Sequence, residues 1–353
     1  MTHHLPIAAA GAVAVADNGA PAAEAAAAAT AAHLHAEAIV IDTHCDTLGR
    51  VLEGRWRLGE RADQGQFDLV RAREGGLSAE VMATFVSHQR HGEPLRQSLE
   101  FIDVLHGEIA ANPGRARLAT RGEDVRAAKA AGEVALFLGM EGAEGLAGSL
   151  AALRAFHGLG LRVLGLTWNR RNEAADGVGE LPHAGGLSSF GRALVRACDR
   201  LGILLDVSHL APAGVADVLE LAERPVTATH ANAQAVHPHP RNLSDAQLEA
   251  IAASGGVVGV VPVPPFLGPY EQRAPLAPLL RHLDHMIATI GDDHVGLGLD
   301  FDGVGAMRTE GIEDVAALPN LTAAMLAHGY APDRIRKVLG GNFLRVFDAV
   351  FDA

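Results

Sequence analysis

Short runs of apolar, mostly β-branched residues recur along the chain and predict eight β-strands. Longer stretches between many of these runs space their apolar residues as amphipathic helices do. The predicted strands are Ala38–Ile41, Ala79–Val86, Val134–Leu138, Arg162–Leu166, Ile203–Val207, Pro225–Ala228, Val257–Val261 and Val295–Leu299. The predicted helices include Pro94–Ala111, Leu187–Leu201, Ala211–Ala222, Asp245–Ala253, Arg281–Ile290, Asn320–His328 and Pro332–Val350. Near-continuous apolar strands that alternate with helices indicate a parallel sheet covered by helices.

The predicted fold class is α/β, in the form of a (β/α)8 TIM barrel. Eight strand and helix units fit this barrel, which typically takes about 250 residues plus insertions. A doubly wound open sheet is the alternative, but no G-x-G-x-x-G follows the first predicted strand. No internal repeat or Pro/Ser-rich linker interrupts residues 38–353, which we expect to form one catalytic domain. Residues 1–37 are predicted to be an alanine-rich tail or a leading helix.

Composition and charge exclude several classes of protein. The 353 residues carry a formal net charge of -13 and only 4% aromatic residues, which argues against a nucleic-acid-binding surface. Two cysteines are too few for a disulfide scaffold or a Cys-rich zinc module. Residues 1–49 contain no Lys or Arg, and the apolar stretch Ile7–Ala16 is too short to span a membrane. We therefore expect a cytoplasmic protein without a membrane partner, with export by an atypical N-terminal signal as the alternative.

Histidines and carboxylates stand at the C-terminal ends of five predicted strands. These residues are His44, Asp46, Glu141, His209, His230, Asp300 and Asp302. In a parallel barrel all C-terminal strand ends meet at one face, where active sites form, so residues distant in the sequence should converge there. His44 and Asp46 are two residues apart and should point to the same side of a strand, whereas Cys45 should point into the helix layer as a buried apolar residue.

Imidazole and carboxylate ligands without thiolate suit a catalytic site for divalent metal ions. Zinc is expected first, with manganese, cobalt or iron(II) as alternatives. Even five of these side chains would be too many ligands for one tetrahedral ion that keeps an open position. Five ligands fit two ions that are bridged by one carboxylate. Two such ions about 3.5–4 Å apart lower the pKa of a shared water to about 7 and supply a nucleophile for a carbonyl or phosphoryl centre.

An ordered series of motifs resembles the membrane dipeptidase (renal dipeptidase) family of zinc peptidases, which are amidohydrolase-like barrels. The resemblance covers nearly the whole chain, from about Ile39 to Phe347. The matching stretches read IDTHCDT, LGMEGAEG, GLRVLGLTWNRRN, GLSSFGRALVRACDRLGILLDVSH, ATHANA, HPHPRNLSD, SGGVVGV, DDHVGLGLDFDGV and LGGNFLRVF. A single H-x-D or DFDG would be a weak signal, whereas the whole series in this order is specific.

The resemblance implies a role for each site residue. It assigns His44 and Asp46 to one metal ion, His209 and His230 to the other, and Glu141 to the bridge between them. Asp300 is similar to the family's acid/base carboxylate, which receives a proton from the attacking water and passes it to the departing amine, although Asp302 could take this role instead. Arg241 is similar to the arginine that pairs with the substrate's terminal carboxylate, and a guanidinium fork suits that task. The resemblance also implies a homodimer.

Two departures from the mammalian members fall in the substrate pocket. Trp168 stands where those members carry a histidine that polarises the substrate carbonyl, and Val263 lies where they have a tyrosine. The expected function is a two-metal dipeptidase that acts on dipeptides with a free C-terminal carboxylate, with C-terminal D-residues included among the candidates. A related amide or lactam hydrolase acting on N-acyl amino acids or a biosynthetic intermediate is the first alternative. A non-catalytic metal-binding barrel is the second, although no ligand is missing.

Overall fold

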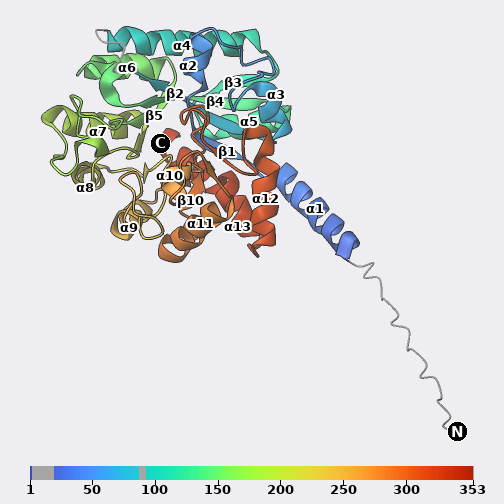
Figure 1. Ribbon diagram of the computed structural model, residues 1–353. Helices are drawn as coiled ribbons and strands as arrows, with labels where there is room; N and C mark the ends of the chain where they lie inside the picture. The colour runs from blue at the N-terminus through green and yellow to red at the C-terminus, as the bar shows by residue number, and fades with distance from the viewer. Residues whose placement is uncertain (2–19, 87–92, 353) are drawn as a thin grey trace.

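The computed structural model describes residues 1, 20–86 and 93–352, and its centre is a curled parallel sheet surrounded by helices (Figure 1). The strands that form the curled wall follow each other in chain order. They are β1 (Ile41–Cys45), β2 (Ala79–Phe85), β4 (Val134–Glu141), β5 (Leu161–Gly165), β6 (Leu204–Asp206), β7 (Val226–Thr227), β8 (Val258–Val260) and β10 (Val295–Leu297). All pairings within this wall are parallel, as expected for successive right-handed βαβ units.

Two single bridges close this wall into a barrel. Ala228, just after β7, pairs with Val258 of β8, and Cys45 of β1 pairs with Phe301, beyond β10. Backbone hydrogen bonds from Asp46 N to Phe301 O (2.8 Å) and from Asp300 N to His44 O (3.1 Å) hold the second seam together. The prediction of a (β/α)8 barrel is confirmed. The bridge between Cys45 and Phe301 lies beside His44, Asp46 and Asp300, which the sequence predicts to be site residues.

All eight predicted strands overlap the observed ones, but the first was placed too early and shares only Ile41 with β1. The strand begins at Ile41 and includes His44, whereas the prediction ended at Ile41. Two polar residues within β1, Asp42 and Thr43, concealed it, because both are buried. Asp42 Oδ1 accepts from Leu299 N and Thr43 Oγ1 bonds to Thr229 O and Leu297 O, while Asp42 Oδ2 has no hydrogen-bond partner among the described residues. A further strand that was not predicted, β3 (Ala116–Ala119), pairs with the first half of β4.

The predicted helices are all present, with shifted bounds in several cases. The helices that follow the wall strands along the chain include α2 (Thr47–Leu52), α4 (Pro94–Ala111), α5 (Gly122–Ala131), α6 (Leu150–Gly158), α7 (Ser189–Leu201), α8 (Pro212–Leu221), α9 (Asp245–Ala253), α11 (Ala277–Ile290) and α12 (Leu318–Ala327). Shorter elements are α3 (Leu69–Glu74), α10 (Pro264–Leu267), β9 (Arg273–Ala274) and β11 (Arg308–Thr309). Their apolar faces and the outer face of the sheet form one large buried core.

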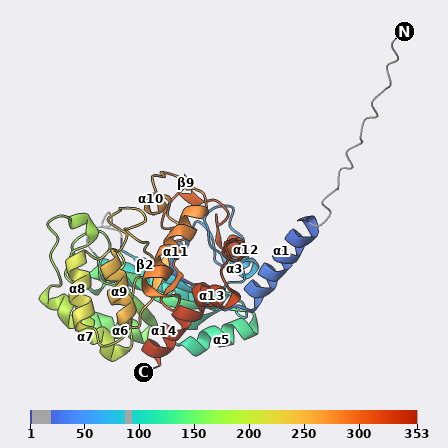
Figure 2. The same ribbon diagram turned by 90° about the horizontal axis from the view of Figure 1, so that it is seen from below.

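The predicted helix Pro332–Val350 is interrupted. The structure has α13 (Pro332–Arg336), a π-helical turn Lys337–Gly341, and α14 (Asn342–Phe351). Gly340 makes the interruption possible, because a Cβ there would lie 2.6 Å from Ile39 O. The close approach seats α14 beneath the barrel (Figure 2), where Phe343 and Phe347 join Phe137 in the apolar filling of the barrel's lower end.

The N-terminal helix α1 (Ala20–Glu37) projects from the barrel, and its last turns pack against α12 (Figures 1 and 2). His35 anchors it, with hydrogen bonds from Nδ1 to Thr322 Oγ1 (2.7 Å) and from Nε2 to Gly75 O (2.8 Å). The predicted apolar stretch Ile7–Ala16 lies outside the described residues, and the domain boundary at residue 38 stays a prediction. Among the described helices, none combines the length and apolar character that a membrane span requires.

Candidate metal centre and active site

The histidines and carboxylates singled out from the sequence converge at the C-terminal mouth of the barrel. His44 comes from β1 and Asp46 follows that strand directly, as the N-cap residue of α2. Glu141 is the last residue of β4, while His209 and His230 lie a few residues beyond β6 and β7. All except Asp46, which is largely covered, are buried. Cys45 points away from the mouth into the outer core, as predicted.

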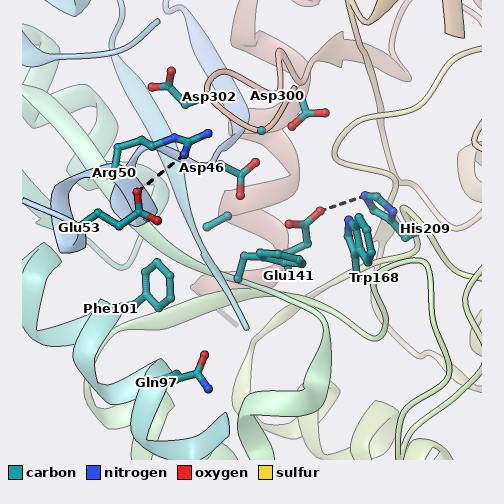
Figure 3. A pocket seen from close by; sticks show the side chains of 14 residues that line it. Asp46, Arg50, Glu53, Gln97, Phe101, Glu141, Trp168, His209, Asp300 and Asp302 are labelled. Carbon is teal, nitrogen blue, oxygen red and sulfur yellow. Dashed lines mark ion pairs between the residues drawn. The ribbon is translucent and has the colours of Figure 1, made fainter. Parts of the chain in front are cut away.

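Glu141 lies at the centre of the histidines. Its Oε1 is 2.9 Å from His209 Nε2, 3.6 Å from His44 Nε2 and 3.8 Å from His230 Nε2. One carboxylate oxygen therefore lies within 3.8 Å of all three histidines, which is the placement expected of a carboxylate shared between ligand groups. In Figure 3, the dashed line that ends at His209 marks its contact with Glu141.

The outer hydrogen bonds of two histidines fix which ring nitrogen carries the proton. His209 Nδ1 lies 2.8 Å from Asn169 Oδ1, which only accepts, so Nδ1 is the donor. His230 Nδ1 lies 2.8 Å from Thr229 Oγ1, and that hydroxyl already donates to Asp206 Oδ2 at 2.6 Å. Both neutral rings therefore direct an Nε2 lone pair toward the centre, and these two atoms are 2.9 Å apart. Such lone pairs repel each other unless a cation or a proton lies between them and the carboxylate.

A second group of ligand atoms lies around His44. His44 Nε2 is 3.4 Å from Asp46 Oδ2 and has no hydrogen-bond partner among the described residues, although it is buried. His44, Asp46 and Asp300 offer ligand atoms that all lie within 4.8 Å of one another, and so do His44, Glu141 and His230. A buried imidazole nitrogen without a partner, surrounded by carboxylates, fits a divalent cation.

Burial and neighbouring charge shift the pKa values of three of these groups in the direction that favours metal binding. The other two shift the opposite way: despite burial, the charges of Glu141 and Asp46 raise the pKa of His44, and burial with the charge of Glu141 raises that of Asp46. Burial, with the positive charge of Arg241, lowers the pKa of His209 to about 4. Burial and the charge of His44 lower the pKa of His230 well below its ordinary value. Burial opposes ionisation of Glu141, but the charge of His44 outweighs it and lowers the pKa of this carboxyl. Neutral imidazoles and an ionised carboxylate are the forms that bind metal.

Three residues at this mouth adopt backbone conformations that side chains other than glycine rarely take. His209, Asp300 and Asp302 have φ angles of 66°, 57° and 65°. Each such conformation costs on the order of 1–3 kcal/mol and persists where surrounding structure enforces it, as at active sites. The seam between β1 and β10 enforces the conformation of Asp300 through the bond from its N–H to His44 O.

The structure separates the two aspartates that the sequence left as alternatives. Asp302 Oδ1 accepts from Gln66 N at 2.8 Å, and its Oδ2 accepts from Thr47 Oγ1 at 2.5 Å. Both of its oxygens are therefore used to hold the start of α2 and the segment around Gln66 in place. The Asp300 carboxylate instead lies with His44 and Asp46, and burial together with the charges of Asp46 and Glu141 raises its pKa well above the ordinary value. This geometry favours Asp300 over Asp302 for chemistry at the centre.

A cavity of about 520 Å³ opens beside the centre (Figure 3). Trp168 forms part of its wall, together with Glu141, His209 and Asp300. The indole packs edge-on against Phe85, at 5.3 Å between ring centroids, and lies 6.0 Å from the His209 ring. Trp168 therefore lines the cavity beside the centre, and its role toward a substrate stays a prediction. Val263 is fully buried and does not line this cavity.

Arg241 lies on the other side of the histidines, in a second cavity of about 410 Å³ that also includes His209. Its Nη2 donates to His230 O at 3.1 Å, and its guanidinium lies over the Phe266 ring at 5.6 Å. Arg241 is 6% exposed, its Nε has no hydrogen-bond partner, and no described carboxylate lies within ion-pair distance of it. A buried guanidinium without a paired carboxylate is stabilised when it binds an anion.

Sequence reasoning missed several residues that shape the centre. Asn169 and Thr229 orient the two histidines, and Asp206 holds the ends of β6 and β7 together by accepting from Ser208 N and Thr229 N. Asp206 and Thr229 precede His209 and His230 within the same strand-end motifs. Their closeness to these histidines in the sequence was the available signal. Arg50 and Glu53, which line the larger cavity, were also missed because α2 was not predicted.

Comparison with known proteins gives one family for almost the whole chain. Residues 28–353 match the family described as membrane dipeptidase (peptidase family M19). A dipeptidase of Claviceps purpurea, tcpJ, is 32% identical over 298 residues, which cover 82% of this chain and 70% of that protein.

Two solved structures are similar over most of the barrel. A metallopeptidase from Rhodobacter sphaeroides, solved with a phosphinate mimic of the dipeptide L-Ala-D-Ala, is 37% identical with a TM-score of 0.82, covering 89% of this chain and 100% of that one. The probable dipeptidase PvdM from Pseudomonas aeruginosa is 25% identical with a TM-score of 0.87, covering 93% and 99%.

Proposed function

Because this chain belongs to the membrane dipeptidase family, peptidase family M19, it is a metal-dependent dipeptidase, and we propose that it works with two divalent ions. The observation that carries the proposal is the pair of Nε2 lone pairs of His209 and His230, 2.9 Å apart and directed at Glu141. His209 and His230 would hold one ion, His44 and Asp46 the other, and Glu141 would bridge them. Zinc suits these nitrogen and oxygen donors best, with manganese, cobalt and iron(II) as alternatives.

The chemistry at this mouth is hydrolysis of an amide. When bound, the two ions supply a water of lowered pKa and polarise the scissile carbonyl. Asp300 accepts a proton from the attacking water and passes it to the amide nitrogen as the C–N bond breaks, so that the products are a carboxylic acid and an amine. Asn169 and Thr229 keep the two histidines in the tautomer that this arrangement needs.

Arg241 would fix the substrate by its free C-terminal carboxylate. The guanidinium is buried, is not paired with a described carboxylate, and keeps Nε available after Nη2 bonds to His230 O. Arginine binds carboxylates bidentately, and that grip would hold the scissile amide over Glu141. We propose that C-terminal D-residues are accepted as well as L-residues, since the Rhodobacter sphaeroides relative was solved with a mimic of L-Ala-D-Ala.

A hydrolysis screen tests the proposal. The chain is stripped of metal, reconstituted with zinc or manganese, and assayed on dipeptides that carry L- or D-residues at the C-terminus. We expect turnover that chelation abolishes and the metal restores. Selective hydrolysis of N-acyl amino acids or lactams, without turnover of dipeptides, would instead support the alternative that Trp168 suggests.

Truncation of Arg241 tests substrate anchoring. We expect Arg241→Ala to reduce kcat/KM for a free dipeptide by about 30-fold or more, because losing a buried charge pair costs on the order of 2–5 kcal/mol. The same dipeptide with an amidated C-terminus should be a poor substrate of the unaltered chain and should lose little further activity in the variant. Equal rates on free and amidated dipeptides in the unaltered chain would contradict a carboxylate clamp.

A further inference from the structure

The larger cavity has a charged wall, formed by Arg50 and Glu53 of α2, that the proposed catalytic steps do not use. The lining also includes the aromatic side chains of Phe85 and Phe101. Arg50 stands four residues after Asp46, so one turn of helix places both on the side of α2 that faces the cavity. Figure 3 shows the Arg50 side chain reaching from α2 toward Asp46, above Phe101.

The Arg50 guanidinium is available to a ligand. Its one ion pair among the described residues joins Nη1 to Glu53 Oε2 at 3.9 Å, a distance too long for a hydrogen bond. Glu53 Oε2 is held instead by Arg55 Nε at 2.7 Å. Arg50 is the one arginine in the lining of this cavity, whose charged residues are otherwise carboxylates, and it keeps donors that no hydrogen bond to a described residue uses. Its side chain is 36% exposed.

The direction of the substrate places its N-terminal residue on this wall, a step that rests on the proposed function. Arg241, which would hold the C-terminal carboxylate, bonds to His230 O and lines the second cavity, whereas Arg50 lines the first, and His209 lies in the lining of both. A dipeptide anchored there with its amide over Glu141 extends toward Asp46 and α2. Its N-terminal side chain then lies among Arg50, Phe85 and Phe101.

We propose that Arg50 is a specificity-determining residue that selects dipeptides with an acidic N-terminal side chain. The aromatic rings would pack against the methylene groups of a glutamyl residue, and the guanidinium would bind its carboxylate in a two-pronged ion pair. Glu53 does not oppose this binding, because Arg55 neutralises it. An N-terminal lysyl residue would meet a like charge.

The test compares Glu-Ala with Gln-Ala, which have the same shape and differ in one charge. In the unaltered chain we expect kcat/KM for Glu-Ala to exceed that for Gln-Ala by about tenfold, the effect of one partly exposed charge-assisted pair. In Arg50→Gln the ratio should fall to about one, while kcat/KM for Ala-Ala stays within about twofold of the unaltered value. Arg61→Gln is the matched control, since it removes a surface arginine paired with Glu74, outside the cavity.

A binding measurement separates selection from catalysis. Calorimetric titration with reduced-amide isosteres of Glu-Ala and Gln-Ala should show the same tenfold preference in Kd, again lost only in Arg50→Gln. An equal loss on Glu-Ala, Gln-Ala and Ala-Ala would make Arg50 a structural residue and overturn the proposal. A preference for Lys-Ala that disappears in Glu53→Gln would overturn it in favour of Glu53. Absence of turnover on every dipeptide, Ala-Ala included, would refute the proposed function itself and this inference with it.

Discussion

Replacing Glu141 with glutamine is expected to remove metal from both halves of the centre and to abolish peptide hydrolysis. Glu141 Oε1 lies within 3.8 Å of the Nε2 atoms of His44, His209 and His230, so one carboxylate oxygen serves all three histidines. A neutral amide cannot offset the charge of two divalent ions. The loss of kcat should exceed the 10–100-fold that removal of an outer hydrogen-bond partner of a metal ligand typically costs. Elemental analysis should find close to two ions per chain before the substitution and far less than one after it.

The control for this variant is Glu144→Gln. Glu144 is a half-buried glutamate three residues further along the chain, and burial raises its pKa to about 7. It belongs to neither of the two groups of candidate ligand atoms. It should keep both ions. Full activity of the unaltered chain with one ion would contradict the two-metal proposal, and a Glu141→Gln chain that keeps one tightly bound ion would show that Glu141 does not bridge.

The convergence of the site could be predicted from the sequence because parallel barrels bring their strand ends to one face. Glu141 follows an uninterrupted apolar strand, and His209 and His230 follow two more, so the pattern alone places them together. The strand β1 was displaced in the prediction because Asp42 and Thr43 are polar yet buried. Their hydrogen bonds go to Leu299 N, Thr229 O and Leu297 O, and such long-range partners leave no local signal.

The sequence could not settle features that depend on which side chains meet in space. It left Asp300 and Asp302 as alternatives, and only the bonds from Gln66 N and Thr47 Oγ1 to Asp302 separate them. It also gave no reason to assign the tautomers of His209 and His230, which depend on Asn169 and Thr229. The charged wall around Arg50 was missed because α2 is only six residues long and lacks a periodic pattern.

Replacing Asp300 with asparagine is expected to leave both ions bound and to reduce kcat on dipeptides by about 100-fold or more. An amine is a poor leaving group, so a proton must reach the nitrogen as the C–N bond breaks. Asp300 is held beside His44 and Asp46 by the bond from its N–H to His44 O, and asparagine preserves that bond and the size of the side chain. The measurement pairs steady-state kinetics with metal analysis of the same preparation, and Asp302→Asn serves as the comparison.

A substrate whose leaving group needs no proton distinguishes the possible roles of Asp300. An activated anilide or ester of the same amino acid should recover much of the lost rate in Asp300→Asn, because proton delivery no longer limits the step. Asp302→Asn should instead lower the thermal unfolding midpoint, since it weakens the bonds to Gln66 N and Thr47 Oγ1. Loss of an ion in Asp300→Asn would make Asp300 a metal ligand, as its place beside His44 and Asp46 permits. An equal slowing of activated and ordinary substrates would assign the proton transfer to another group.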